Sequence, residues 1–471
     1  MNYANFISKE KSLLIAPAGF GKTYSLANCL EQTPDDKRQL ILTHTHAGIA
    51  SIKEKVSKFK IPASKYHIET ITGFAQKYTL AFYCQNDIPL QEDSSLYYPF
   101  IVEKATELFN LKTIQKTISY SYDGLFVDEY QDCTDIQHQM ITALSQILPI
   151  HILGDPMQGI FNFNGNLVDF DNDLKDYEKV EQLETPWRWI NAGRNDLGID
   201  LKDIRTKLQQ NEPIKLSNYK SIETIICGEN DWYQPRTLYR NTLMRLLNEE
   251  SLLIIHPITS SIAPRIKILE QFNNRLMLLE SIDSKDAYTI AKYIDNYDNK
   301  SVILFVKELA YSLFNKTGLD NWFNAKGFKR KTDNLSKRKT EELQKLIDEI
   351  QIKMDYSKLA IVIKEIMHLS EIKCYRKDLV FSICRALIVA ESENITVYEA
   401  MISHKNTIRR VGRKVYGKCI GTTLLTKGLE FDTVAILNAH KFDNYKHFYV
   451  AITRACKRLI IFTQSDEITF K

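Results

Sequence analysis

The sequence of 471 residues predicts an α/β protein built on parallel sheets. Three observations support this prediction. The apolar run Leu13–Ile15 leads through a glycine-rich turn into a helix-like segment, Tyr24–Leu30. A second apolar run, Gln39–Thr43, also precedes a helical pattern, and a third, Gly124–Val127, ends in two acidic residues. Strands that alternate with helices are joined by right-handed crossovers into a parallel sheet.

The other elements of the first half follow in order. Residues Tyr66–Thr70 have the pattern of a third strand. Residues 76–121 show helical spacing and many aromatic side chains, which indicates a helical insertion in this sheet domain. The sheet resumes at Gly124, and Ile150–Leu153 is the next strand. Ligands gather at the carboxyl ends of parallel strands, so we expect the functional residues in the loops that follow these strands.

The turn after the first strand has the pattern of a phosphate-binding loop in its Ala-first form, Ala16–Thr23. Two glycines allow backbone N–H groups to turn onto phosphate oxygens, and the following helix N-terminus adds to the attraction. Lys22 supplies a charge for the outer phosphates, and the Thr23 hydroxyl is suited to Mg²⁺. The alternative is a chance glycine turn before a helix. We assign to nucleotide binding Ala16, Gly19, Gly21, Lys22, Thr23 and Tyr24.

The acidic residues after the strand at 124–127 suit a Mg²⁺-nucleotide site. Asp128 is expected to hold the metal through water, and Glu129 to act as the general base on the attacking water. An acidic strand end at the surface is the alternative. Gln158, after the next strand, is placed to touch the γ-phosphate. Phe161 and Phe163 follow it, either to stack on nucleic-acid bases or to pack in the core.

Composition and sequence pattern argue against several classes of protein, among them zinc-binding, secreted and membrane-spanning proteins. The net charge of +4 is only weak support for an anionic partner. Eight scattered cysteines with no C-x-x-C pair argue against a zinc site and favour a reduced, cytoplasmic setting. The N-terminus lacks the pattern of a signal peptide. No apolar run approaches the ~18 residues of a membrane span, so no membrane partner is expected.

A series of segments, in a fixed order along the chain, resembles superfamily 1 helicases of the UvrD, Rep and PcrA type. Beside the phosphate loop, the segments that carry the resemblance are Thr43–Ala47, Glu69–Ala75, Asp128–Asp132, Gly154–Gln158, Leu183–Arg188, Thr426–Asp432 and Tyr449–Leu459. The last of these is similar to the family's closing segment, Tyr-Val-Ala-x-Thr-Arg-Ala-x-x-x-Leu, almost residue for residue.

This resemblance implies two RecA-like P-loop NTPase lobes with ATP and Mg²⁺ in the cleft between them. We expect the first lobe at residues 1–75 and 122–178, with the helical insertion at 76–121. The second lobe is expected at 179–300 and 416–471, with a reduced helical insertion at 301–415. Its expected strands are Val180–Leu183, Thr224–Cys227, Leu252–Ile255, Leu276–Leu279 and Leu459–Phe462.

The resemblance also implies roles for residues of the second lobe. Arg188 and Arg454 would reach the γ-phosphate and neutralise the charge that develops in phosphoryl transfer. Trp187 would replace the tyrosine that stacks on adenine. Glu430 would bind the ribose, and Gly428 would allow a close backbone approach. The alternatives are surface ion pairs for the two arginines and a core aromatic for Trp187.

By the same resemblance, the DNA-binding residues are expected to be His44, Thr45, Thr70, Phe161, Phe163 and Thr422. Several positions depart from the family pattern. His44 stands where a base-stacking Phe is usual, Asn164 replaces an Arg, and Leu424 replaces a His. The family's upstream adenine-reading Gln has no match before Ala16, which leaves the preference for ATP open.

Two basic clusters lie in the 301–415 insertion, where either phosphate contact or a solvated face would explain them. The first comprises Lys326, Lys329, Arg330, Lys331, Lys337, Arg338 and Lys339. The second comprises Arg409, Arg410, Arg413 and Lys414. The chain ends soon after the last family segment, so no C-terminal nuclease domain is expected.

The sequence therefore predicts an ATP-driven translocase or helicase on single-stranded or tailed DNA, with the 3′→5′ polarity that the resemblance implies. A regulatory ATPase that responds to DNA and signals to a separate nuclease subunit is the alternative. Helicase subunits of bacterial anti-phage systems such as Gabija resemble this outline. A nucleotide-binding assembly protein without a DNA role is a third possibility.

Overall fold

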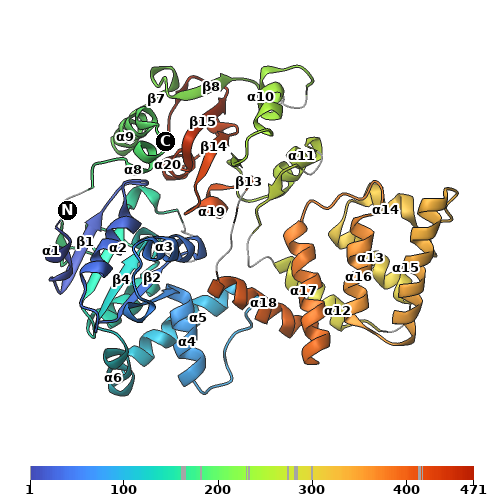
Figure 1. Cartoon of the computed structure of the whole chain (residues 1–471), viewed down its shortest axis with the longest axis horizontal. Coiled ribbons are helices and arrows are strands. Elements are labelled where there is room, and N and C mark those ends of the chain that lie inside the picture. The colour runs from blue at the N-terminus through green and yellow to red at the C-terminus, as the bar shows by residue number, and fades with distance from the viewer. Residues whose placement is uncertain are drawn as a thin grey trace. The chain divides into compact units, whose positions relative to one another are not determined.

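The computed structural model describes residues 2–160, 166–180, 183–229, 231, 234–272, 275–280, 285–298, 301–411, 415 and 417–470, with backbone alone at 46–47 and 409–411. The chain forms two compact units (Figure 1). Unit 1 comprises Met1–Ile262 and Arg409–Lys471, and unit 2 comprises Ala263–Ile408. No described helix has the length and apolar character needed to cross a membrane.

Unit 1 contains two parallel sheets, each with its own helices, which we call the first and second lobes. The strands of the first sheet are β1 (Lys11–Ile15), β2 (Gln39–Thr43), β3 (Tyr66–Thr70), β4 (Gly124–Asp128), β5 (Ile150–Gly154) and β6 (Glu178–Lys179). Its helices are α1 (Tyr3–Ile7), α2 (Lys22–Gln32), α3 (His46–Lys58), α4 (Ile71–Phe82), α5 (Ser94–Phe109), α6 (Lys112–Ser121) and α7 (Asp135–Ser145).

The order of strands in the first sheet positions the functional loops. The order is β3-β2-β4-β5-β1-β6, and every pairing is parallel. Strands β2, β4 and β5 are buried along their whole length, which explains their continuous apolar sequences. Because β5 lies between β1 and β4, the loops after Ile15, Asp128 and Gly154 leave the sheet at the same edge.

The strand expected at Val180–Leu183 in the second lobe is wrong. The structure instead has the short strand β6, which pairs with β1 of the first sheet. The Val180 N–H extends this pairing by donating to the Leu13 carbonyl at 3.0 Å. The chain thus completes the first sheet before it enters the second lobe, and residues 181–182 lie outside the described part.

The second lobe is assembled from two separate parts of the chain. Within unit 1 its strands run in the order β13-β9-β14-β15-β8, all parallel. Their bounds are β8 (Ile222–Ile226), β9 (Leu252–Ile255), β13 (Lys418–Gly421), β14 (Phe431–Ile436) and β15 (Ala455–Thr463). Strands β7 (Ile214–Lys215) and β16 (Glu467–Ile468) form a separate antiparallel pair. The helices are α8 (Trp187–Asn191), α9 (Asn195–Gln209), α10 (Leu238–Leu246), α19 (Thr423–Thr426) and α20 (Tyr445–Ile452).

Unit 2 is mostly helical. Its elements are α11 (Ala263–Gln271), β10 (Met277–Leu278), α12 (Lys285–Asp295), α13 (Val302–Leu313), α14 (Lys316–Trp322), β11 (Phe323–Asn324), β12 (Gly327–Phe328), α15 (Asn334–Ile352), α16 (Tyr356–Met367), α17 (Lys377–Glu393) and α18 (Val397–Val411). One apolar core joins α12, α13, α15, α16, α17 and α18. The unit begins at Ala263 rather than at the expected 301, because the apolar face of α12 belongs to this core.

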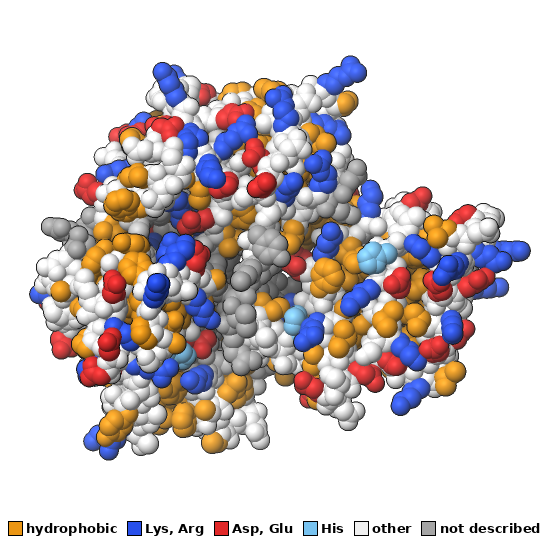
Figure 2. All heavy atoms as spheres, in the orientation of Figure 1, with side chains coloured by type: hydrophobic (Ala, Val, Ile, Leu, Met, Phe, Trp, Pro, Cys, Tyr) orange, Lys and Arg blue, Asp and Glu red, His pale blue; other side chains and the backbone are white. Residues whose placement is uncertain are grey.

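The first basic cluster lies on the surface of unit 2. Most of its side chains are exposed, and Arg338 pairs with Glu342 one helical turn away at 2.8 Å. On the face seen in Figure 2, Lys and Arg side chains are interspersed with Asp and Glu. Such a mixture is typical of a solvated surface. The second cluster falls on side chains outside the described part of the chain.

Candidate nucleotide site

The phosphate loop joins β1 to α2, and its glycines adopt backbone angles that other residues avoid. Gly19 has φ +76° and Gly21 has φ +97°, both in the left-handed region. A Cβ on Gly19 would lie 2.8 Å from the Trp189 ring, so the loop also needs glycine for space. Gly21 is the N-cap residue of α2, which begins at Lys22. The loop therefore presents a helix N-terminus, where backbone N–H groups favour an anion.

The acidic pair lies at the end of β4, close to the loop's lysine. Asp128 is 2% exposed, and the Lys22 Nζ lies 3.7 Å from Glu129 Oε1. Glu129 has φ +58°, an uncommon angle for a residue with a side chain, which is characteristic of functional positions. Burial and the neighbouring Glu129 charge raise the pKa of Asp128. Burial alone would also raise the pKa of Glu129, but the positive charges of Lys22 and Lys427 outweigh it and lower that pKa.

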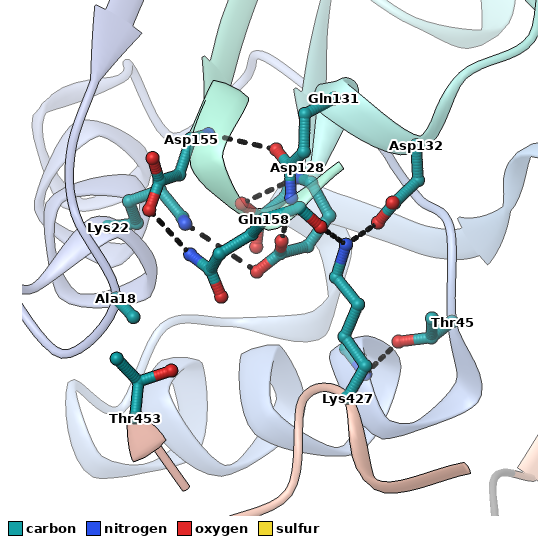
Figure 3. Close-up of polar contacts among 12 residues, drawn as sticks. Ala18, Lys22, Thr45, Asp128, Gln131, Asp132, Asp155, Gln158, Lys427 and Thr453 are labelled. Carbon is teal, nitrogen blue, oxygen red and sulfur yellow. Dashed lines mark hydrogen bonds and ion pairs between the residues drawn. The ribbon is translucent and has the colours of Figure 1, made fainter. Parts of the chain in front are cut away.

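A chain of amide and carboxylate contacts links the acidic pair to Gln158 (Figure 3). Gln131 donates from Nε2 to Glu129 and accepts from the Asp155 N–H at 2.9 Å through Oε1. Gln158 donates from Nε2 to Asp155 Oδ2, also at 2.9 Å. This leaves Gln158 Oε1 directed away from Asp155. The expected general base, Glu129, and the residue expected to sense the γ-phosphate, Gln158, thus belong to one hydrogen-bond network.

Arg454 of the second lobe reaches this network. It is 2% exposed, and its Nη2 donates to Gln158 Oε1 at 3.2 Å. Its Nε donates to the Val450 carbonyl at 2.9 Å, which fixes the guanidinium. Burial lowers the pKa of Arg454 to about 10, and the nearby Arg188 charge adds to this effect. A guanidinium held in such surroundings would gain from a bound anion.

Arg188 and Glu430 contact each other in this structure. Arg188 Nη2 lies 2.6 Å from Glu430 Oε1, and Nη1 donates to the Thr453 carbonyl. The Arg188 N–H donates to the Gly19 carbonyl at 3.0 Å, which ties α8 to the phosphate loop. Arg188 Nε is buried and has no hydrogen-bond partner among the described residues. The γ-phosphate and ribose contacts expected for these residues would require the Arg188–Glu430 pair to open.

Trp187 lies beside the phosphate loop with a free surface. Its side chain is 51% exposed, and its Cδ1 would be 3.4 Å from a Cβ on Gly21. The alternative of a core aromatic fits Trp189 instead, which is 1% exposed. Gly428 has φ +78°, in keeping with a position reserved for glycine. Tyr24 is also 51% exposed, and its ring packs against Phe59.

Lys427 makes a second link between the lobes, which the sequence analysis did not assign. Its side chain is buried, and its Nζ contacts both the Asp132 carboxylate and the Gln158 carbonyl (Figure 3). Lys427 belongs to the second lobe, whereas its two partners belong to the first. Both residues of the ion pair occur in family-like segments, but spacing alone gave no sign that they would meet.

The expected DNA-binding residues fall at strand ends. Thr45 follows β2, and Thr70 is the last residue of the neighbouring strand β3. The two residues cap α3 and α4, accepting from the N–H groups of the third helical residues. His44 Nε2 lies 3.3 Å from Gln137 Oε1, and burial lowers the pKa of its ring. Thr422 is 2% exposed and precedes α19. Phe161 and Phe163 lie outside the described residues.

The residues of the cleft fit a magnesium nucleotide. The donor set offered to the metal, the Thr23 hydroxyl and the Asp128 carboxylate, consists of the oxygen ligands that Mg²⁺ prefers. A cation there would offset the repulsion between the Asp128 and Glu129 carboxylates. An anionic phosphate would offer a partner to the buried Arg188 Nε and to Arg454.

Comparison with known proteins agrees with this geometry. The family model described as AAA domain matches residues 3–164. The Gabija protein GajB of Bacillus cereus (strain VD045) is 22% identical over 77% of this chain and 68% of that protein. The exonuclease/helicase protein RexA of Lactococcus lactis subsp. cremoris (strain MG1363) is 25% identical over 41% of this chain and 16% of that protein. These matches agree with the resemblance of the chain to superfamily 1 helicases of the UvrD type.

The chain spans different shares of its relatives, about two thirds of the Gabija protein but a small part of RexA. Among solved structures, the Pif1 helicase from Candida albicans aligns with 100% of this chain and 95% of its own, at 10% identity. The TM-score is 0.44, too low to establish a common fold. The resemblance to helicases therefore rests on the sequence relatives and not on this structural alignment.

Proposed function

We propose that the chain is an ATP-driven translocase on single-stranded DNA with 3′→5′ polarity. The observation that carries this proposal is the convergence of both lobes on Gln158. Arg454 of the second lobe donates to its side chain, and Lys427 contacts its carbonyl. A residue that touches the γ-phosphate and both lobes can convert the presence of that phosphate into a change in how the lobes meet.

Each residue of the site has its own proposed role in ATP hydrolysis. Bound Mg·ATP would supply the transferable phosphoryl group and the metal charge, with Thr23 and Asp128 holding the metal. Lys22 and the N-terminus of α2 would bind the phosphates. Glu129, kept ionised by Lys22 and Lys427, would orient the attacking water and accept its proton. Arg454 would neutralise the charge that develops on the transferred group.

The DNA track is proposed to cross the carboxyl ends of β2 and β3. The caps of α3 and α4 leave helix N-termini at this edge, and such termini suit phosphate oxygens. Thr45 and Thr70 accept from backbone N–H groups through their hydroxyl oxygens, so their hydroxyl protons remain available to a phosphate. Opening and closing of the cleft would then move the strand relative to this edge.

A second candidate is a DNA-responsive ATPase that signals to a partner nuclease, as in anti-phage defence. Its support is the 22% identity with the Gabija protein over 77% of this chain. It shares the nucleotide site with the translocase and differs in whether ATP turnover moves DNA.

A strand-displacement assay with tailed duplexes separates the two. We expect the isolated chain to unwind a duplex with a 3′ single-stranded tail, and not one with a 5′ tail. Unwinding of neither duplex, with ATP turnover still stimulated by DNA, would favour the signalling ATPase. Unwinding from the 5′ tail alone would contradict the proposed polarity.

A further inference from the structure

A third arginine from the second lobe is buried in the cleft, although no family-like segment contains it. Arg205 lies on α9 and is 5% exposed. Its Nη1 donates to Asp155 Oδ2 at 2.8 Å, and Asp155 is fully buried at the end of β5. The ion pair therefore joins the two lobes out of contact with water. Burying an ion pair costs desolvation free energy unless each charged group has its hydrogen-bond partners. The partners of Asp155 and Arg205 therefore indicate what the pair holds in place.

Through Asp155, Arg205 determines how Gln158 is oriented. The Asp155 carboxylate accepts from Gln158 Nε2 at 2.9 Å and from the Met157 N–H at 3.2 Å. An ionised carboxylate can only accept, so it selects the amide nitrogen of Gln158 and turns the amide oxygen outward. That oxygen is the atom that contacts Arg454. The positive charge of Arg205 lies beside the fully buried Asp155 carboxylate and offsets its negative charge.

The same guanidinium nitrogen is also linked to the phosphate loop, through the Tyr449 hydroxyl. Arg205 Nη1 donates to the Tyr449 hydroxyl at 2.9 Å, and that hydroxyl accepts from the Ala18 N–H at 3.3 Å. The guanidinium carbon lies 5.2 Å from the centre of the Tyr449 ring, which adds a cation–π contact. One arginine thus holds the loop that binds phosphates and the residue that senses them.

We propose that Arg205 is a positioning residue for ATP hydrolysis, which orients Gln158 through Asp155 and the phosphate loop through Tyr449. The inference rests on the proposed function, since it assumes that this cleft hydrolyses ATP. We assign Arg205 no contact with the nucleotide or the attacking water. Its loss would leave the buried Asp155 carboxylate without its counter-charge, and Asp155 would no longer hold the Gln158 amide in this orientation.

Steady-state ATPase kinetics of Arg205→Met in the full chain test this inference. We expect kcat to fall about 10- to 100-fold, because small displacements of catalytic groups have effects of that size, while KM for ATP changes less than about threefold. Arg205→Lys should recover part of kcat. The matched control is Lys202→Met on the same helix, where the lysine makes only a surface ion pair with Glu184 at 3.5 Å. This control should retain the wild-type kcat.

Coupling to Gln158 separates positioning from a general structural role. In a Gln158→Ala background, adding Arg205→Met should lower kcat clearly less than it does in the wild-type background, because one of the two groups that Arg205 positions is already gone and only the route through Tyr449 remains. A full additional loss would overturn the proposed route through Gln158. Wild-type kcat in folded Arg205→Met, or a change confined to KM, would overturn the inference as a whole.

Tyr449→Phe is the second variant, in case Arg205→Met fails to fold. It keeps the ion pair and the ring packing and removes only the hydroxyl between Arg205 and Ala18. We expect a lower kcat with an unchanged melting temperature, and wild-type kcat would overturn the inference. Absence of ATPase activity in the wild-type chain, with and without DNA, would instead refute the proposed function.

Discussion

The candidate nucleotide site of unit 1 and the first basic cluster of unit 2 place their charged side chains in opposite surroundings. The cleft buries charged groups from both lobes, among them Asp132, Asp155, Arg205, Lys427 and Arg454. The main core of unit 2 consists of apolar side chains, and its first basic cluster lies mostly in solvent. A buried charge depends on its partner, whereas solvated charges without shared partners act nearly independently. Substitutions should therefore have large, coupled effects in the cleft and small, separate effects on the surface of unit 2.

The largest effect is expected for the general base. Glu129→Gln keeps the shape of the side chain but removes the carboxylate that would accept a proton. We expect kcat for ATP to fall about 10²- to 10⁴-fold, while nucleotide binding and the melting temperature are retained. Lys22→Ala should also abolish turnover, by weakening the hold on the phosphates. Appreciable turnover in either variant would refute the assigned site.

The buried ion pair between the lobes provides the second test. Lys427→Met leaves the Asp132 carboxylate buried without its partner, so we expect the free energy of unfolding of unit 1 to fall by about 3–5 kcal/mol. Urea denaturation of the full chain measures this loss. The control is Lys427→Met combined with Asp132→Asn, which removes the unpaired charge and should recover much of the stability. A single variant as stable as wild type would mean that the pair contributes nothing.

A buried histidine predicts how stability depends on pH. Burial lowers the pKa of His151 to about 4, and its Nδ1 lies 2.8 Å from Ser12 Oγ. Between its ordinary pKa and 4, the unfolded chain binds a proton that the folded chain does not. Stability from this residue is therefore complete above about pH 6.5 and falls as the pH drops, by about 2 kcal/mol at pH 5.

Comparison of the wild-type chain with His151→Asn isolates this effect. The variant keeps a hydrogen-bonding side chain but has no group that titrates in this range. Urea denaturation at pH 7 and pH 5 should show the wild-type chain losing about 2 kcal/mol more than the variant. Equal losses would show that His151 is protonated in the folded state.

The smallest effect is expected on the surface of unit 2. Replacing Lys337, Arg338 and Lys339 by alanine removes three charges near the start of α15. Among the described residues, the ion pair lost is that between Arg338 and Glu342. We expect each substitution to change the free energy of unfolding by less than about 0.5 kcal/mol. A loss of unfolding free energy comparable to that of Lys427→Met would contradict the expected difference between buried and exposed charges.

Much of the fold could be predicted from local sequence. The strands at Tyr66–Thr70 and Leu252–Ile255 have the expected bounds, because each is a short apolar or alternating run between turns. The strand expected at Val180–Leu183 in the second lobe was wrong, because the strand in this region is β6 at Glu178–Lys179, which belongs to the first sheet. Local pattern identifies a strand but not its neighbour, and the pairing of β6 with β1 depends on where the chain returns.

The cleft was predictable where a single segment carries the chemistry and not where distant segments meet. The phosphate loop is such a segment. Arg205 was missed because an arginine in an amphipathic helix is usually a surface cation. Its spacing held a signal, since Arg205 lies four residues after Leu201 and three before Leu208, both buried. A charge on the apolar face of a helix requires a buried partner, but the sequence does not show that the partner is Asp155.

The most direct test of the account is the steady-state ATPase rate with and without single-stranded DNA, with Glu129→Gln as the control for contaminating activity. The proposed translocation mechanism requires that the two lobes share one nucleotide site and that DNA binding changes how they meet. It predicts strong stimulation by DNA in the wild-type chain and none in the variant. A wild-type rate that is measurable but unaffected by DNA would contradict coupling between the cleft and a DNA track.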